Sequence, residues 1–176
     1  MQQERYFWLI RHGKTLDGSP DHERELSPRG HKDAKLLQAC FSSHSHSAQW
    51  VWSSDAKRAL QTATYVQSAF SNPNGQAVDL IVQPQLYLAG PEAILNCLQI
   101  TPENINVCAL VAHNPGLTQC TNLFAQTTIT NNLPTFGVAL FSFTGEWPDL
   151  TFGNTTLINT YTPKTLRNPP PTGTLT

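Results

Sequence analysis

The chain has 176 residues, 39% of them hydrophobic and 13% charged, with a formal net charge of −1. This length suits one domain whose core needs neither disulfides nor a metal. The net charge gives no bulk attraction to nucleic acid or to an acidic membrane, and no apolar run approaches the roughly 18 residues of a membrane-spanning helix. The first residues also lack the order of a signal peptide, so we expect a cytoplasmic protein without nucleic-acid or membrane partners.

The positive charges are unevenly distributed along the chain. Nine of the eleven Lys and Arg residues lie between Arg5 and Arg58, and the next cation is Lys164. Any anion site must therefore take its side-chain charge from the first third of the chain or from the tail. The four cysteines form no CxxC pair and no tight cluster with histidine, which zinc sites usually need, so we expect four reduced thiols in or near the core.

The first half of the chain alternates between strand and helix patterns. An apolar run at 6–11 predicts a buried strand, and Ser27-Pro28 supplies a hydroxyl cap and a proline for a helix running to about Phe41. The other predicted elements are a loop at 17–25, a strand at 50–53, a helix capped by Ser54 or Asp55, a break at 72–75, and a short strand at 80–82.

The second half continues the alternation. It predicts a helix at 91–98, a strand at 107–112, a helix opened by Pro115, and closing strands at 138–143 and around 150–152. Residues 162–176 are rich in Pro and Thr, so we assign one domain to residues 1–161 and an irregular tail to 162–176. Strands interleaved with helices predict an α/β fold, a three-layer α/β/α sandwich with a mostly parallel central sheet.

Three segments with chemically active side chains come at or just after predicted strands. They hold Arg11-His12-Gly13, Ser54 to Arg58, and His113-Asn114. Because ligand sites of such sheets lie beyond the carboxyl ends of the strands, Arg11, His12, Arg58 and His113 can converge on one site. Each has an ordinary structural explanation when taken singly. Together, two guanidinium groups and two imidazoles suit a phosphoryl group, which one imidazole could carry covalently.

This ordered set resembles the histidine phosphatase superfamily, also called phosphoglycerate mutase-like. The family has Arg-His-Gly after the first strand, matched here by Arg11-His12-Gly13. It then has a Ser followed by Arg-Ala and Gln-Thr-Ala, matched by Ser53-Ser54 with Arg58 to Ala63. Its third element is a His after an apolar strand, here His113. The resemblance, over about residues 6–145, implies a metal-independent phosphatase with His12 as nucleophile and Arg11, Arg58 and His113 around the phosphate. It makes Thr15, Ser54 and Asn114 weaker candidates for substrate binding, and Lys14 stands where many members have Glu or Gln.

One departure from the family bears on the substrate. Many members carry a carboxyl group that protonates the leaving group, but residues 83–90 hold none, and Asn114 follows His113. Glu92 remains a fallback, and a proton role for Tyr87 stays open. An imidazole leaving from phosphohistidine has a pKa near roughly 6.5 and needs no dedicated acid. The chain is thus similar to the compact SixA-type phosphohistidine phosphatases, which act on phosphorylated protein.

Two alternatives stay open at this point. The first is a phosphatase of the same superfamily that acts on a small phosphorylated substrate, with Glu92 or water as the acid. The second, from another class, is a catalytically silent module that binds phosphate or a phosphoprotein. Such a module would keep the arginines but would not need His12, so the intact set of four residues favours an enzyme.

Overall fold

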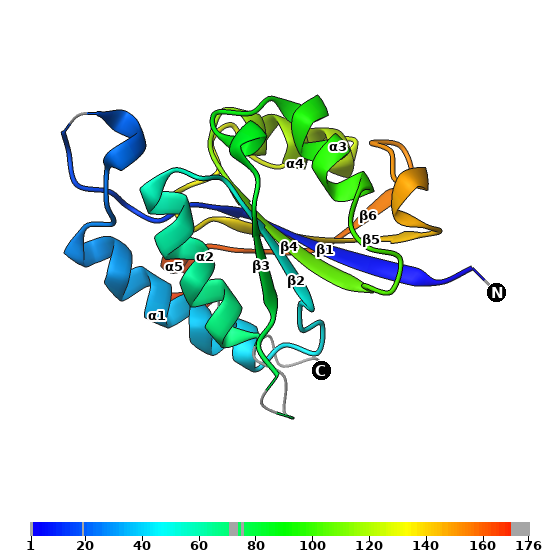
Figure 1. Cartoon of the computed structure of the whole chain (residues 1–176), viewed down its shortest axis with the longest axis horizontal. Helices are drawn as coiled ribbons and strands as arrows, with labels where there is room; N and C mark the ends of the chain where they lie inside the picture. The colour runs from blue at the N-terminus through cyan, green and yellow to red at the C-terminus, as the bar shows by residue number, and fades with distance from the viewer. Residues whose placement is uncertain (1, 19, 71–73, 75, 170–176) are drawn as a thin grey trace, which may run out of the picture.

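The computed structural model describes residues 2–18, 20–70, 74 and 76–169, and the protein is built on one six-stranded sheet (Figure 1). The strand order is β3-β2-β4-β1-β5-β6. The first four strands of that order run parallel to one another, whereas β5 runs antiparallel to both of its neighbours, β1 and β6. The strands are β1 (Glu4–Arg11), β2 (Trp50–Ser53), β3 (Asp79–Val82), β4 (Val107–Ala112), β5 (Val138–Thr144) and β6 (Thr155–Tyr161).

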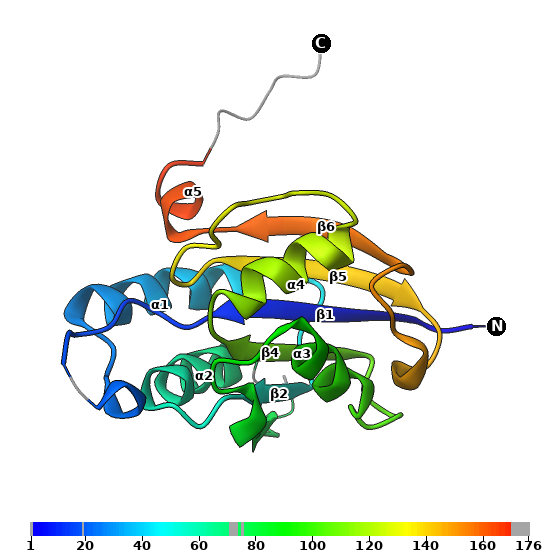
Figure 2. The ribbon, with the colours of Figure 1, turned by 90° about the horizontal axis from the view of Figure 1, so that it is seen from above.

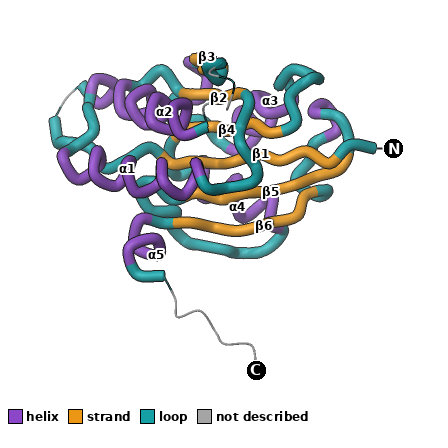
Figure 3. The backbone as a smooth tube through the Cα atoms, turned by 90° about the horizontal axis from the view of Figure 1, so that it is seen from below, coloured by secondary structure: helices purple, strands orange, loops and turns teal. Residues whose placement is uncertain are grey.

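Helices cover both faces of the sheet, so the predicted three-layer sandwich is confirmed. On one face lie α1 (Pro28–Ser42), α2 (Lys57–Ala69) and α5 (Pro163–Arg167), and on the other α3 (Pro91–Gln99) and α4 (Gly116–Ala125) (Figures 1 and 2). Short 3-10 helices occupy Asp21–Glu23, Pro84–Leu86 and Trp147–Asp149. The tube in Figure 3, which looks onto the sheet, shows the strands lying side by side from β3 to β6.

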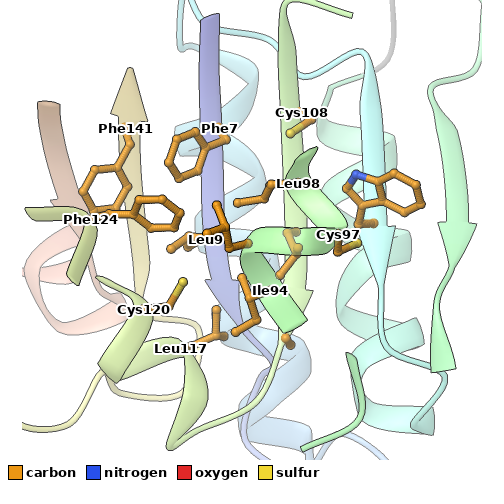
Figure 4. Packing of buried hydrophobic residues seen from close by; sticks show 14 of the residues in the cluster. Phe7, Leu9, Ile94, Cys97, Leu98, Cys108, Leu117, Cys120, Phe124 and Phe141 are labelled. Carbon is orange, nitrogen blue, oxygen red and sulfur yellow. The ribbon is translucent and has the colours of Figure 1, made fainter. Parts of the chain in front are cut away.

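The central strands are apolar because both of their faces are covered. Phe7 and Leu9 of β1 point to the layer of α3 and α4, while Trp8 and Ile10 point to the layer of α1 and α2, and all four are fully buried. Figure 4 shows the first of these two cores, where Phe7 and Leu9 pack with side chains from α3 and α4. Since β1 lies between β4 and β5, its carboxyl end is in the middle of the sheet edge.

The thiols behave as core residues. Cys97, Cys108 and Cys120 are buried and free, and Cys40 is half-buried and free. Burial raises the pKa of Cys97 to about 12, because a thiolate loses its hydration in an apolar environment. Cys97 and Cys120 appear in Figure 4 among the aliphatic side chains.

Two helix starts differ from the sequence expectation. Ser27 caps α1 as predicted, since its hydroxyl accepts a hydrogen bond from Gly30 N–H. The cap of α2 is Ala56, not Ser54 or Asp55, and it makes no side-chain cap bond. Ser54 instead accepts a hydrogen bond from Ala56 N–H at 3.2 Å. The other helix, α4, has Pro115 as its cap and begins one residue later, at Gly116.

The last strand was placed wrongly by the sequence pattern. Residues 150–152 are a loop in which Leu150 is buried in the core and Phe152 packs against it, and the strand is β6 at Thr155–Tyr161. This edge strand is polar and no residue in it is fully buried, so it lacks the apolar signal by which a strand is recognised. The predicted break at 72–75 lies, apart from Asn74, outside the described residues.

The expected irregular tail needs correction at residues 163–167, and residues 170–176 of that tail lie outside the described part of the chain. Residues Pro163–Arg167 form the short helix α5, capped by Thr162, whose side chain accepts a hydrogen bond from Thr165 N–H. Leu166 packs against the core on the side of α1, so a local cap and one apolar contact order this segment. Within the described part of the chain, no helix is both long and apolar enough to cross a membrane.

Candidate active site

His12 follows directly after β1, and its backbone surroundings define which ring nitrogen carries the proton. Its Nδ1 lies 2.8 Å from the carbonyl oxygen of Gly13, an acceptor only, so Nδ1 must be the protonated nitrogen. The Gly13 N–H in turn donates to Thr62 Oγ1 of α2 at 3.0 Å. The opposite nitrogen, Nε2, therefore carries a lone pair and is the ring's potential nucleophile.

Gly13 is required beside His12 because another side chain occupies the space of a Cβ. A Cβ built on Gly13 would lie 2.1 Å from the ring of Phe136, which is buried. Phe136 N–H donates to the carbonyl oxygens of Arg11 and His12, so the 130–137 segment closes tightly over the end of β1. The Arg-His-Gly triplet thus reflects packing as well as chemistry.

His113 follows β4, the parallel neighbour of β1. Because Arg11 and Ala112 are register partners, the two histidines emerge side by side, with ring centroids 5.1 Å apart. His113 Nε2 lies 2.8 Å from Ser54 Oγ, which already accepts a hydrogen bond from Ala56 N–H. The Ser54 hydroxyl has one proton, which it can donate to Nε2, and the proton of the His113 ring then lies on Nδ1. That Nδ1 is buried without a partner in the structure.

Arg58 reaches the same place from the first turn of α2. Its side chain is 4% exposed, and its Nε donates to His12 Nε2 at 3.4 Å. Its two outer nitrogens donate to the backbone oxygen of Asp21 at 2.6 Å and to Asp21 Oδ2 at 2.9 Å. Since a guanidinium group has five N–H donors, two donors remain for another acceptor.

Arg11 is held at the other side of His12. Its Nη1 donates to the backbone oxygen of Leu133 at 2.7 Å, while its Nε is buried and has no partner in the structure. Arg11 and His12 line a cavity of about 220 Å³, whose remaining lining residues are Lys14, Thr15, Asp17, Arg24, Arg58 and Thr135. Four cations and one carboxylate surround this space, so it favours an anion.

Both imidazoles are uncharged at neutral pH. Burial lowers the pKa of His12 to about 4, and the nearby Arg58 and Arg11 add to the effect, although the Gly13 carbonyl opposes it. Burial likewise lowers the pKa of His113 to about 3, with smaller contributions from His12 and Arg58. A neutral His12 has its lone pair available, and a neutral His113 can still donate one hydrogen bond.

The predicted site residues divide into three groups. Arg11, His12, Arg58 and His113 meet at the carboxyl edge of the parallel strands, and Thr15 lines the cavity. Ser54 lies behind His113 and orients it. The side chain of Asn114 is engaged elsewhere: its amide group donates to Asn132 and Leu133, and its oxygen accepts from Thr118. Asn114 therefore fastens the neighbouring loop, and its side chain is not among those lining the cavity.

Asp21 is a site residue that sequence reasoning missed. It sits on the 3-10 helix within the segment expected to be a plain loop, and it accepts hydrogen bonds from Arg58 and, at 2.6 Å, from the hydroxyl of Tyr87. The bond from Tyr87 is the largest cause that holds the pKa of Asp21 well below its usual range, and Arg58 adds to it. Only the concentration of charge between Asp17 and Glu25 pointed to this segment.

Tyr87 does reach the site, whereas Glu92 does not. The Tyr87 ring lies edge-on to His113, with centroids 5.5 Å apart, and Arg58 lies over its face. Glu92 is exposed on the first turn of α3 and neither lines the cavity nor bonds to a site residue in the described structure. Among the residues that the structure describes, no group of three or more His, Cys, Asp or Glu side chains could hold a metal ion.

A comparison with known families fits this arrangement. Residues 7–85 match the model of the histidine phosphatase superfamily (branch 1), a segment that includes Arg11, His12 and Arg58. Over this segment the chain is similar to the histidine phosphatase superfamily. This similarity supports a phosphatase, that is, a hydrolase acting on a phosphorylated substrate.

Individual proteins extend the likeness over almost the whole chain. An uncharacterized protein of Mycobacterium tuberculosis is 26% identical over 166 residues, which span 88% of this chain and 100% of that protein. A structure from Nakamurella multipartitia, assigned as the phosphohistidine phosphatase SixA, is 22% identical with a TM-score of 0.78 and covers 91% of this chain and 96% of that one. The protein histidine phosphatase SixA in complex with tungstate is 22% identical with a TM-score of 0.72, covering 92% and 99%. The chain therefore has the same fold as these SixA structures.

Proposed function

We propose that this chain is a metal-independent phosphatase in which His12 Nε2 accepts the phosphoryl group to form a phosphohistidine intermediate. The observation that carries the proposal is the neutral His12 ring, whose Nδ1 proton is committed to Gly13, lying among Arg58, Arg11 and His113. A neutral imidazole can attack phosphorus directly. The unpartnered Arg11 Nε and His113 Nδ1 are donors that a phosphate oxygen would satisfy.

The reaction follows in two displacements. In the first, the lone pair of His12 Nε2 forms a bond to phosphorus while the bond to the leaving group breaks, and the leaving group takes the electron pair. In the second, water attacks phosphorus, the Nε2–P bond breaks, and both hydrogens of the water stay with the phosphate. Arg11 and Arg58 bind the phosphoryl oxygens throughout, and this matters because phosphoryl transfer depends mainly on positioning and charge stabilisation.

The finer proposal is that the substrate is phosphohistidine on a protein. Asp21, the carboxylate bonded to Arg58, has a lowered pKa and is ionised at neutral pH, so it has no proton to give an alkoxide leaving group. A leaving imidazole can already carry its proton on its second ring nitrogen, because its free pKa is near roughly 6.5. The SixA-type fold supports the same substrate class. A cytoplasmic protein partner is part of this proposal.

The decisive experiment traps the intermediate. Brief incubation with a labelled phosphorylated substrate, followed by an alkaline quench, should give a base-stable and acid-labile phosphoenzyme that maps to His12. His12→Ala should abolish turnover and labelling yet remain folded, since this residue at the strand end contributes little packing. His46→Ala is the matched control, because His46 precedes β2 at the opposite edge of the sheet. Turnover retained by His12→Ala would rule the mechanism out.

A substrate panel separates the two enzymatic readings. We expect the rate on histidine-phosphorylated protein to exceed the rate on sugar phosphates, which have an alkoxide leaving group. The reverse order would favour the small-molecule phosphatase. Vanadate inhibition of measurable turnover would exclude a silent phosphate-binding module, since such a module has no turnover to inhibit.

A further inference from the structure

A second basic cavity adjoins the first and is not needed for the phosphoryl chemistry. It has a volume of about 300 Å³, and the cations that line it are Lys14, Arg29, Lys164 and Arg167. Lys14 and Thr135 line both this cavity and the one at His12. The two spaces are therefore neighbours.

One buried carboxylate organises the arginines of this second cavity. Asp33 on α1 is 8% exposed and accepts a hydrogen bond from Arg29 Nε at 3.1 Å and another from Arg167 Nη1 at 2.6 Å. This pairing fixes two guanidinium groups and still leaves most of their donors without a described partner. Asp33 cancels one of four positive charges, so the cavity keeps an excess of three.

The two lysines supply charge that nothing in the described structure neutralises. Neither the Lys14 nor the Lys164 ammonium group has a hydrogen-bond or ion-pair partner among the described residues. Lys164 and Arg167 are the only cations of the chain after Arg58, and both lie on α5, which packs against α1. The cap at Thr162 and the apolar contact of Leu166 hold this helix in place. The late cations thus join the early ones at one point on the surface.

We infer that this second cavity binds a further anionic group, a carboxylate or a phosphate, of the same substrate whose phosphoryl group is transferred to His12. The inference rests on the proposed function, because it assigns the second anion to that substrate. The second anion has two possible sources: an acidic side chain that flanks the phosphorylated residue of a polypeptide, or a second phosphate of a small bisphosphate. Both would meet the two arginine forks fixed by Asp33 and the ammonium groups of Lys14 and Lys164.

The test compares substrates that differ only in the second anion. One pair is a histidine-phosphorylated peptide with acidic flanking residues and its counterpart in which Asp and Glu are replaced by Asn and Gln. The other pair is a small bisphosphate and its monophosphate. For wild type we expect a lower KM for the doubly anionic member of at least one pair, and the pair that responds identifies the source. The preference should shrink as salt is raised, since exposed charges are screened.

Charge reversal at Lys164 tests the residues. Lys164→Glu should reduce the preference, measured as the ratio of kcat/KM values within a pair, by at least about fivefold, because attraction is replaced by repulsion. Lys35→Glu is the matched control: it makes the same charge change on the exposed surface of α1, outside both cavities. An undiminished preference in Lys164→Glu, or none in wild type, overturns the inference.

Calorimetry of inorganic phosphate binding distinguishes a failure of the second site from a failure of the proposed function. If wild type binds phosphate and forms the phosphoenzyme but shows no preference within either pair, the second site fails and the proposed function stands. If neither binding nor a phosphoenzyme is found, the proposed function fails, and the second site falls with it.

Discussion

The two ends of β1 each carry an arginine, Arg5 buried and Arg11 partly buried, and the two differ in how their donors are used. Arg5, 1% exposed, donates through Nε to Gly145 O at 2.9 Å and through Nη1 to Ile105 O at 2.6 Å, and it forms an ion pair with Glu146. Arg11, six residues along the same strand, keeps a buried Nε without a partner in the structure. At one end of the strand every guanidinium nitrogen has a hydrogen-bond partner, and at the other end one guanidinium nitrogen has none.

This difference separates a structural cation from one available to a ligand. Buried polar groups are nearly always paired within the protein, so an unpaired one calls for an explanation. Arg5 lies at the amino edge of the parallel strands, where it ties together the segments before β4 and after β5. Arg11 and Arg58 lie at the carboxyl edge, where ligands of α/β sheets bind. Arg5 and Arg58 are both buried, so neither residue type nor burial separates these two, whereas their unused donors do.

The largest expected effect is on stability, from Arg5→Met. Removing the guanidinium leaves buried carbonyl oxygens unsatisfied and Glu146 unpaired, so we expect a loss of about 3 kcal/mol or more in the free energy of unfolding. The folded fraction should keep wild-type turnover. Arg11→Met should show the opposite pattern, a smaller loss of stability and a greater loss of activity. Urea unfolding and specific activity measure both, and equal stability losses would break the comparison.

A smaller effect is expected on phosphate binding, from Arg58→Ala. This change removes donors from the cavity at His12, so phosphate binding should weaken by at least about 1.5 kcal/mol, the lower end for a charge-assisted hydrogen bond. Lys57→Ala serves as the control, because the neighbouring Lys57 forms an exposed ion pair with Glu25 and does not line the cavity. Inhibition by phosphate or vanadate gives the measurement, and unchanged inhibition in Arg58→Ala would contradict the role assigned to it.

The pH dependence of stability tests whether the two histidines of the site, His12 and His113, are held uncharged. The pKa of His12 is lowered to about 4, and that of His113 to about 3, from an ordinary value of 6.5. Below about pH 6.5 the unfolded chain binds protons that the folded chain does not, so stability falls as pH falls until the folded imidazoles also become protonated. Each contributes a slope of about 1.4 kcal/mol per pH unit within this window. Denaturant unfolding between pH 7 and pH 5 should show a shallower slope for His12→Gln, and an identical slope would mean that His12 is not held neutral.

Much of the fold and the centre of the site could be predicted from the sequence, because their signals are local. Apolar runs that end in Arg11-His12 and in His113 mark buried parallel strands and their carboxyl ends, and a strand's neighbours then bring the side chains together. The edge strand β6 was misplaced because it buries little, and α5 was missed because five residues with a threonine cap give no periodic pattern.

Asp21 was missed for a different reason. Its place in the site depends on contacts with Arg58 and Tyr87, which are 37 and 66 residues away in sequence. No spacing rule links a loop carboxylate to a helix and to a later turn. Its role becomes visible only when the loop is seen lying across the start of α2, where Glu25 and His22 also pair with Lys57 and Asp55.

The smallest expected effect sharpens the comparison at Arg58, whose guanidinium group has hydrogen-bond partners for only some of its N–H donors. The Tyr87 hydroxyl donates to Asp21 Oδ2, the same oxygen that accepts from Arg58, so it helps to keep the carboxylate ionised and the arginine in place. Tyr87→Phe removes that bond, so the pKa of Asp21 should rise and phosphate binding should weaken by about 1 kcal/mol or less, the scale of a single hydrogen bond. Tyr65→Phe, which removes a hydroxyl bonded to His31, is the matched control. A loss as large as that of Arg58→Ala would mean that Tyr87 itself contacts the phosphate. No loss, and no change in the acid limb of the kcat/KM profile, would mean that Asp21 and Arg58 hold their positions without the hydrogen bond from Tyr87.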